Sequence, residues 1–255
     1  MLPFVSFMGR QVSTYALFGL VGFFSAVLVA GTRCQRHGFS RQDSVFIGLF
    51  AGVGLVAGGS FLYILLQLPR ILQTREFFAA NPLALLPFMC GMVFYGGLLG
   101  AIIGILVYCC FIGASFADAL KLGVPVFPLA HFFMRIGCFF AGCCYGIPHQ
   151  LGIAFENPIG APSGVPLVPV QLLEALVNMI IFVYIWRFSA IKRRWQDIAV
   201  RYMAMYASAR FFLEFLRGDE RGSILFMSTS RFISVAILLA CLYILRKENF
   251  FKNFC

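Results

Sequence analysis

The chain has 255 residues, of which 61% are hydrophobic and only 12% are charged, whereas a water-soluble domain carries roughly 25% charged residues. The mean hydropathy of +0.89 likewise excludes an ordinary soluble protein. The net charge of +10 favours anionic lipid headgroups over nucleic acid as the partner, because the basic residues gather beside the ends of apolar runs. We therefore expect an integral membrane protein that contacts membrane lipid and binds no nucleic acid.

Five apolar runs are long enough to cross the hydrocarbon core of a bilayer as helices, which takes about 20 residues. They cover residues 15–30, 45–66, 85–112, 170–186 and 232–245. Two further runs, 122–140 and 198–216, are interrupted by charged side chains, and prolines break the first of these. The pattern predicts an all-α polytopic membrane protein of about seven transmembrane helices, one of them broken, in a single domain over residues 1–255.

The distribution of Lys and Arg between alternate connections predicts the orientation. With the N-terminus outside, the inner segments hold 12 basic residues and the outer segments hold 6. The longest connection, residues 142–169, then lies outside, and it contains five prolines but no Lys or Arg. We expect the N-terminus outside, the C-terminus inside, and an extracytoplasmic cap over residues 142–169.

Small residues recur at helical spacing along the second and third runs: Gly54, Gly58, Gly96, Gly100 and Gly104. Such spacing is typical of helices that pack closely in membranes. In the segment FYGGLLG at 94–100, Gly96 and Gly97 also expose backbone beside Tyr95. We therefore keep these three residues as candidates for the functional site.

Arg135 and Arg210 lie inside apolar runs, where an arginine at the centre of a lone helix costs about 2.5–3.5 kcal/mol on insertion scales. Both must therefore face a cavity or a partner. Arg210 shares one helix face with Glu214 and Arg217, which follow at i+4 and i+7. His131, Arg135, Cys138 and Gly142 form a second stripe. Two polar stripes in an apolar bundle predict a shared polar chamber.

Two carboxylates offer these arginines a purely structural role. Glu174 stands with Gln171 near the start of the run 170–186, and separate pairs of Arg135 with Glu174 and Arg210 with Glu214 would satisfy both guanidiniums. Alternatively the guanidiniums hold a phosphate, because each offers a planar fork of donors to anionic oxygens. The residues alone leave both alternatives open.

The nine cysteines predict no disulfide framework, because their number is odd and several lie within apolar runs. Cys138, Cys143 and Cys144 follow a C-x4-C-C spacing, which is not a recognised metal-ligand spacing. We interpret them as packing side chains and expect neither a metal nor a cofactor.

Four blocks resemble the prolipoprotein diacylglyceryl transferase family in order and spacing. They are FYGGLLG at 94–100, MRIGCFFAGCCYG at 134–146, PVQLLEA at 169–175 and RFFLEFLRGDERG at 210–222. The resemblance implies an enzyme of the bacterial cytoplasmic (inner) membrane. It would transfer the diacylglyceryl group of phosphatidylglycerol to the lipobox cysteine thiol of preprolipoproteins and release glycerol phosphate.

By the same resemblance, Arg135 and Arg210 would hold the lipid phosphate, and Tyr15, Glu214 and Arg217 stand where the family has functional residues. Tyr95 stands where many members carry His, and Cys138 and Cys143 where the block often has Asn and Glu. The expected site comprises the catalytic residues Arg135, Arg210 and Tyr95 and the substrate-binding residues Tyr15, Gly96, Gly97, Cys138, Gly142, Gln171, Glu174, Glu214 and Arg217.

Two questions stay open at this point. The base that deprotonates the acceptor thiol is either Tyr95, if a nearby arginine lowers its pKa, or His131, whose pKa is naturally suitable. The same arginines would also serve a family relative that modifies another acceptor, or a transporter of anions or lipids.

Overall fold

The computed structural model describes residues 3–7, 9–73, 91–191, 193–219, 223–224 and 227–252. The chain forms two compact units, one made of Met1–Val29 with Gly123–Cys255 and the other of Ala30–Leu122. The predicted start of the third run, residues 85–90, lies outside the described residues.

Six helical segments in the described part of the chain are long and apolar enough to cross a membrane. They are α1 (Thr14–Gly31), α2 (Arg41–Gln73), α5 (Phe94–Ile112), α6 (Phe116–Gly123) continued by α7 (Phe127–Ala141), α8 (Val170–Phe188) and α10 (Thr229–Lys252). They confirm an all-α, multi-pass membrane protein.

The seventh predicted span is the helix α9 (Trp195–Leu213), which has 19 residues. It is not among the six apolar segments, because Asp197, Arg201 and Arg210 lower its hydropathy. A short 3-10 turn, η4 (Glu214–Leu216), continues it. The least apolar helix of membrane-spanning length therefore carries functional candidates.

The broken span is helical on both sides of its break. A 3-10 turn, η3 (Val124–Val126), joins α6 to α7, and Pro125 and Pro128 lie in the first turns of η3 and α7. Proline suits these positions because it lacks only an N–H that a helix start leaves unbonded. The two prolines therefore favour the start of a new helix, α7, which carries Arg135.

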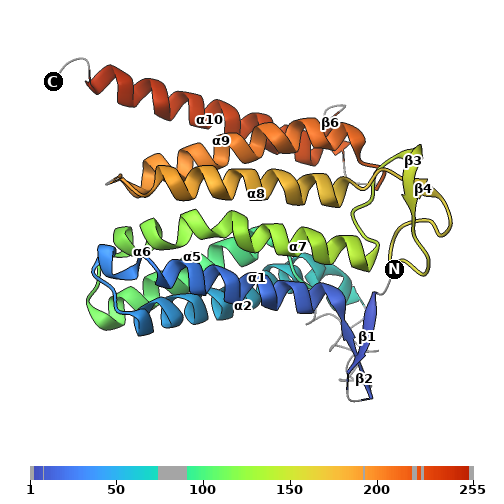
Figure 1. Ribbon diagram of the computed structural model, residues 1–255, viewed down its shortest axis with the longest axis horizontal. Coiled ribbons are helices and arrows are strands. Elements are labelled where there is room, and N and C mark those ends of the chain that lie inside the picture. The colour runs from blue at the N-terminus through green and yellow to red at the C-terminus, as the bar shows by residue number, and fades with distance from the viewer. Residues whose placement is uncertain are drawn as a thin grey trace. The chain divides into compact units, whose positions relative to one another are not determined.

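In the first unit, α7, α8, α9 and α10 lie side by side in that order (Figure 1). Helix α1 contacts α7 through two glycines. A Cβ at Gly22 would lie 2.9 Å from the Ala130 carbonyl oxygen, and one at Gly137 would lie 3.2 Å from the Tyr15 Cα. Larger residues at either glycine would push α1 away from the helix of Arg135.

The connection 142–169 forms a small layer beyond the ends of α7 and α8. Its strands β3 (Pro148–Ala154) and β4 (Pro166–Leu167) pair antiparallel, and Phe155, Ala161 and Leu167 form its buried core. Two other short hairpins join β1 (Phe4–Phe7) to β2 (Arg10–Ser13) and β5 (Ser223–Ile224) to β6 (Met227–Ser228).

In the second unit, α2 and α5 pack backbone to backbone. A Cβ at Gly54 or at Gly100 would overlap the other residue's carbonyl oxygen, and Gly58 and Gly96 stand in the same relation. The predicted glycine face is therefore a close helix contact, as expected for small residues in membranes. This unit also contains the 3-10 turn η1 (Cys34–His37).

Candidate active site

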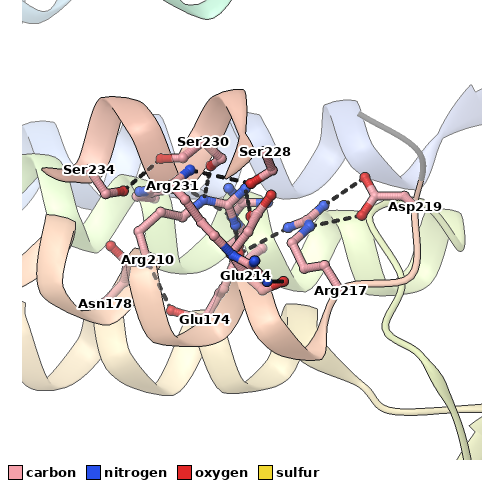
Figure 2. Close-up of polar contacts among 12 residues, drawn as sticks. Glu174, Asn178, Arg210, Glu214, Arg217, Asp219, Ser228, Ser230, Arg231 and Ser234 are labelled. Atoms are coloured by element: carbon pink, nitrogen blue, oxygen red, sulfur yellow. Dashed lines mark hydrogen bonds and ion pairs between the residues drawn. The ribbon is translucent and has the colours of Figure 1, made fainter. Parts of the chain in front are cut away.

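Glu174, near the start of α8, is the centre of a buried cluster of charged side chains. Its Oε1 atom accepts hydrogen bonds from Arg210 and, at 3.0 Å, from Nη1 of Arg217. Its Oε2 atom lies 2.6 Å from Nε of Arg135. One carboxylate thus joins three arginines, and Figure 2 shows Arg210, Glu214 and Arg217 gathered beside it.

The cluster draws its members from three neighbouring helices. Arg135 comes from α7, Glu174 from α8 and Arg210 from α9, while Arg217 directly follows η4. Arg210 and Glu214, at i and i+4, pair with Nη2 and Oε2 2.9 Å apart. The two ion pairs considered from the sequence therefore both form, but Glu174 links them into a single network.

Each nitrogen of the Arg210 guanidinium has a partner. Nε donates to Ser230 Oγ at 2.9 Å, Nη1 donates to Glu174, and Nη2 is paired with Glu214. The residue is only 7% exposed. Arg210 is therefore fixed in position and has little capacity for a further ligand.

Arg217 is held in a similar way and bonds the same Glu174 oxygen as Arg210. Its Nε and Nη2 donate to the two carboxylate oxygens of Asp219 at 2.8 and 3.0 Å, while Nη1 donates to Glu174. Burial alone lowers the pKa of Arg217, but the Asp219 hydrogen bonds and the charges of Glu174 and Cys144 raise it above its ordinary value. Arg217 is thus a permanently charged, fully engaged guanidinium.

Arg135 differs from these two arginines. Its Nε contacts Glu174 and donates to His131 Nε2 at 3.2 Å. Its terminal nitrogens make no hydrogen bond within the described ranges, and 14% of its side chain is exposed. Arg135 therefore presents a positioned pair of terminal nitrogens whose N–H groups no described residue uses.

Two buried amides extend the polar surface around Glu174. Asn178 Nδ2 donates to the Glu174 carbonyl oxygen at 2.8 Å, and Gln171 Nε2 donates to the Cys143 carbonyl oxygen at 2.7 Å. Among the described residues, neither amide oxygen has a hydrogen-bond donor. A buried amide oxygen normally has one, so both could accept from a bound hydroxyl group.

The end of α7 brings three thiols next to this cluster. Gly142 ends the helix with φ +70°, and a Cβ there would lie 2.5 Å from the Pro158 Cβ. The Sγ atoms of Cys138, Cys143 and Cys144 all lie within 4.8 Å of one another. Within the described part of the chain, they form the only group of three or more His, Cys, Asp or Glu side chains close enough together to hold a metal ion.

The other predicted site residues lie on α1 and in the second unit. Tyr15, at the start of α1, is 36% exposed, and its backbone contacts Gly137 of the helix that carries Arg135. Tyr95 is 50% exposed. Gly96 and Gly97 are buried against α2, so helix packing explains their small size. A substrate role for these four residues stays a prediction.

Sequence reasoning missed several members of the cluster. Asp219, Ser230 and Asn178 were not selected, although Asp219 lies only two residues after Arg217. Arg231 was also missed; its Nη2 donates to the Glu214 carbonyl oxygen, and its guanidinium lies 3.8 Å from the centre of the Phe215 ring. A polar residue next to an already selected arginine was the available signal for Asp219.

The fold and this cluster define a multi-pass α-helical membrane protein with a buried arginine–carboxylate site. A sequence model of the prolipoprotein diacylglyceryl transferase family matches residues 3–246. The chain belongs to this family, which confirms the resemblance seen in the four sequence blocks.

Relatives with a stated activity agree with this assignment. The chain is 31% identical over 247 residues to the phosphatidylglycerol–prolipoprotein diacylglyceryl transferase of Clostridium tetani, with 96% of each chain covered. It is 31% identical over 234 residues to the transferase 2 of the same name from Clostridium perfringens, covering 91% of this chain and 89% of the relative. The enzymatic function predicted from the sequence is the one that these names state.

Proposed function

We propose that this protein transfers the diacylglyceryl group of phosphatidylglycerol to the cysteine thiol of a preprolipoprotein and releases glycerol phosphate. Family membership and the names of the relatives support the reaction. The observation that carries the site assignment is the unused pair of donors on Arg135 beside a carboxylate that fixes two further arginines.

In this proposal Arg135 is the guanidinium that contacts the lipid phosphate. A planar fork of N–H donors binds two anionic oxygens at once, and only terminal nitrogens without protein partners are ready to do so. Arg210 and Arg217 act indirectly, because they fix Glu174, and Glu174 orients Arg135. This gives the two arginines predicted as catalytic, Arg135 and Arg210, unequal roles.

The charge of the cluster suits a phosphodiester. The described residues supply four guanidiniums, counting Arg231, and three carboxylates from Glu174, Glu214 and Asp219. The excess of one positive charge matches the single negative charge of phosphatidylglycerol. As the leaving group develops a second negative charge, preorganised donors stabilise it more than they stabilise the substrate.

An open apolar groove of about 410 Å³ between α8 and α9 could hold an acyl chain of this lipid. Its lining residues are Val177, Ile180, Ile181, Ala204, Met205 and Ser208. Val177 follows Glu174 by three residues, and Ser208 precedes Arg210 by two. The groove and the charged cluster thus use the same two helices, as a lipid with a polar headgroup requires.

The reaction forms a sulfur–carbon bond to the glyceryl carbon that carries the phosphate and breaks the carbon–oxygen bond to that phosphate. The acceptor thiol must lose its proton, because the thiolate is the nucleophile. His131 already accepts a hydrogen bond from Arg135 through Nε2, which leaves that nitrogen poorly placed as a base. Tyr95 stays a candidate base.

We place the enzyme in the bacterial cytoplasmic membrane with its N-terminus outside, its C-terminus inside and the segment 142–169 at the outer surface. The excess of basic residues in the inner segments supports this orientation. A fluorescent protein that folds only in the cytoplasm should fluoresce when fused to the C-terminus. A dark fusion that is stably expressed would contradict the orientation.

The decisive test supplies purified protein in phosphatidylglycerol vesicles with a peptide that contains a lipobox cysteine. Mass spectrometry should show a diacylglyceryl adduct on that cysteine, and a peptide with serine at the same position is the control. A transporter would produce no adduct but would move labelled lipid or phosphate across the vesicle membrane. Adducts only on other acceptors would identify a relative of different specificity.

A further inference from the structure

Three cysteines at the outer end of α7 converge although the sequence spaces them unusually. The α7 helix ends at Gly142, and the Cys143 backbone N–H donates back to the Cys138 carbonyl oxygen at 3.2 Å. Cys144 then adopts φ +59°, a left-handed conformation that is uncommon for residues other than glycine. This chain reversal brings the Sγ atoms of Cys138, Cys143 and Cys144 within 4.8 Å of one another.

The spacing of these atoms fits a metal ion. A tetrahedral zinc ion with Zn–S bonds of about 2.3 Å holds its sulfur ligands about 3.8 Å apart, so shifts of roughly 1 Å would complete the geometry. Cys138 is buried, whereas Cys143 and Cys144 are partly exposed, so an ion can reach the thiols. The weak contact from Cys143 Sγ to the Cys138 carbonyl oxygen, 3.7 Å, would be replaced by a metal bond.

Cysteine binds metal as the thiolate, and neighbouring elements hold the three side chains in place beside the arginine cluster. Cys138 follows Arg135 by one helical turn, and Gln171 anchors the Cys143 carbonyl oxygen. A disulfide would need only two of these cysteines, whereas a metal ion accounts for the convergence of all three.

Three protein ligands leave one position of a tetrahedral ion open, which distinguishes catalytic from structural zinc sites. We propose that Cys138, Cys143 and Cys144 bind one zinc ion as thiolates, and that the acceptor thiol of the protein substrate becomes its fourth ligand. The second half rests on the proposed function, because only a thiol acceptor makes the open position useful. Neither half needs Tyr95 or His131 as the base.

The step balances without an oxidant or reductant. On binding zinc the acceptor thiol releases its proton to water, because a coordinating thiol is deprotonated outright. The bound sulfur then forms its bond to the glyceryl carbon, and the carbon–oxygen bond breaks so that its electron pair leaves with glycerol phosphate. The thioether product is neutral and a weak zinc ligand, so it dissociates and frees the position.

Metal binding is tested on the purified protein in lipid nanodiscs under reducing conditions. We expect about one zinc per chain and, after exchange with cobalt(II), the near-ultraviolet absorption of cobalt–thiolate bonds. Each of the variants C138S, C143S and C144S should bind the metal more than about 100-fold more weakly. The matched control C110S changes an exposed cysteine of α5 and should bind like the wild type.

A metal-free wild type that takes up neither ion, or serine variants that bind as tightly as the control, would overturn the site. So would a disulfide between any two of the three cysteines in the freshly purified protein. Thermal unfolding of each variant checks that a loss of metal does not simply report misfolding. Cobalt titration of the chelator-treated wild type gives the same answer without any substitution.

The second claim, that the acceptor thiol becomes the fourth ligand of the metal, is tested by adding the lipobox peptide to the cobalt-loaded protein without phosphatidylglycerol. The spectrum should change as a fourth thiolate binds, and the serine peptide should leave it unchanged. No change with the cysteine peptide, or full transfer by the metal-free enzyme, would overturn this half and leave the proposed function intact. Failure of the zinc-loaded wild type to transfer would instead count against the proposed function, while the metal-binding result stands by itself.

Discussion

The protein brings helices together in two different ways. Between α2 and α5, glycines let the backbones touch at Gly54 and Gly100, and the contact needs no charge. Between α7, α8 and α9, a carboxylate and three arginines fill the space around Glu174. Because the first contact shows that this chain can pack helices without ions, helix packing does not explain the second. The buried charges are better explained by what they orient, namely the donors of Arg135.

The largest expected effect comes from Glu174→Gln, which leaves three guanidiniums without their shared carboxylate. Breaking a buried ion pair by removing one partner costs about 3–5 kcal/mol, so we expect the free energy of unfolding to fall by at least about 3 kcal/mol and transfer to be lost. Thermal unfolding in nanodiscs and the peptide assay measure both. If the free energy of unfolding fell by less than about 1 kcal/mol, Glu174 would not be stabilising the contact between these helices.

A substitution in the glycine contact between α2 and α5 should lower stability without changing the rate of transfer. A methyl group at Gly100 would overlap the Gly54 carbonyl, and overpacking of this kind costs about 1–3 kcal/mol. Gly100→Ala should therefore lower the unfolding temperature while transfer per folded molecule is unchanged. The matched control is Gly123→Ala, because a Cβ there meets nothing within 4 Å and φ is −78°. Equal unfolding temperatures for both variants would contradict the close contact.

These two regions also show how far the sequence could lead. Hydropathy located the spans, and residue spacing identified the glycine face and the polar stripe of Arg210, Glu214 and Arg217, because helical periodicity is a local property. The start of α5 at Phe94 could not be found in this way, because the apolar run continues on the N-terminal side of it. Hydropathy shows where apolar residues begin and end, but the first residue of a helix is set by its backbone hydrogen bonds.

Substitutions of the two arginines should show which of them contacts the lipid phosphate and which mainly stabilises the charged cluster. Arg135→Lys should lower transfer at least about tenfold, equivalent to about 1.4 kcal/mol, because lysine lacks the planar fork. Its stability should change little, since a lysine keeps the positive charge beside Glu174 that Arg135 Nε supplies, and the Arg135 terminal nitrogens have no partner to lose within the described ranges. Arg210→Lys should lower stability as well as transfer, because all three nitrogens of Arg210 are engaged. Identical profiles for the two variants would contradict their unequal roles.

The sequence could not distinguish these two arginines, since both lie in apolar runs with a glutamate available. The distinction depends on which nitrogen faces which oxygen, and therefore on contacts such as Ser230 with Arg210, 20 residues apart in sequence. The convergence of Cys138, Cys143 and Cys144 could not be predicted for a similar reason. Motif spacings describe ligands on one regular element, whereas Gly142 reverses the chain between Cys138 and Cys143. Tertiary contacts of this kind leave no periodic signal.

The smallest effect is expected for an ion pair outside the cluster, and it tests whether burial or charge itself matters. Arg194 Nη2 lies 3.0 Å from Asp197 Oδ1 at the start of α9, and the arginine side chain is 58% exposed. Exposed pairs contribute about 0–1 kcal/mol. Asp197 also lies in the first turn of α9, where its interaction with the positive end of the helix dipole adds about 0.3–1 kcal/mol. Asp197→Asn should therefore cost about 1 kcal/mol at low salt. In about 1 M salt, where the Debye length is about 3 Å, its cost should vanish, whereas the loss caused by Glu174→Gln should persist because water and ions do not reach a buried cluster. If salt removed both differences alike, Glu174 would be in contact with solvent and the cluster could not hold Arg135 in one orientation.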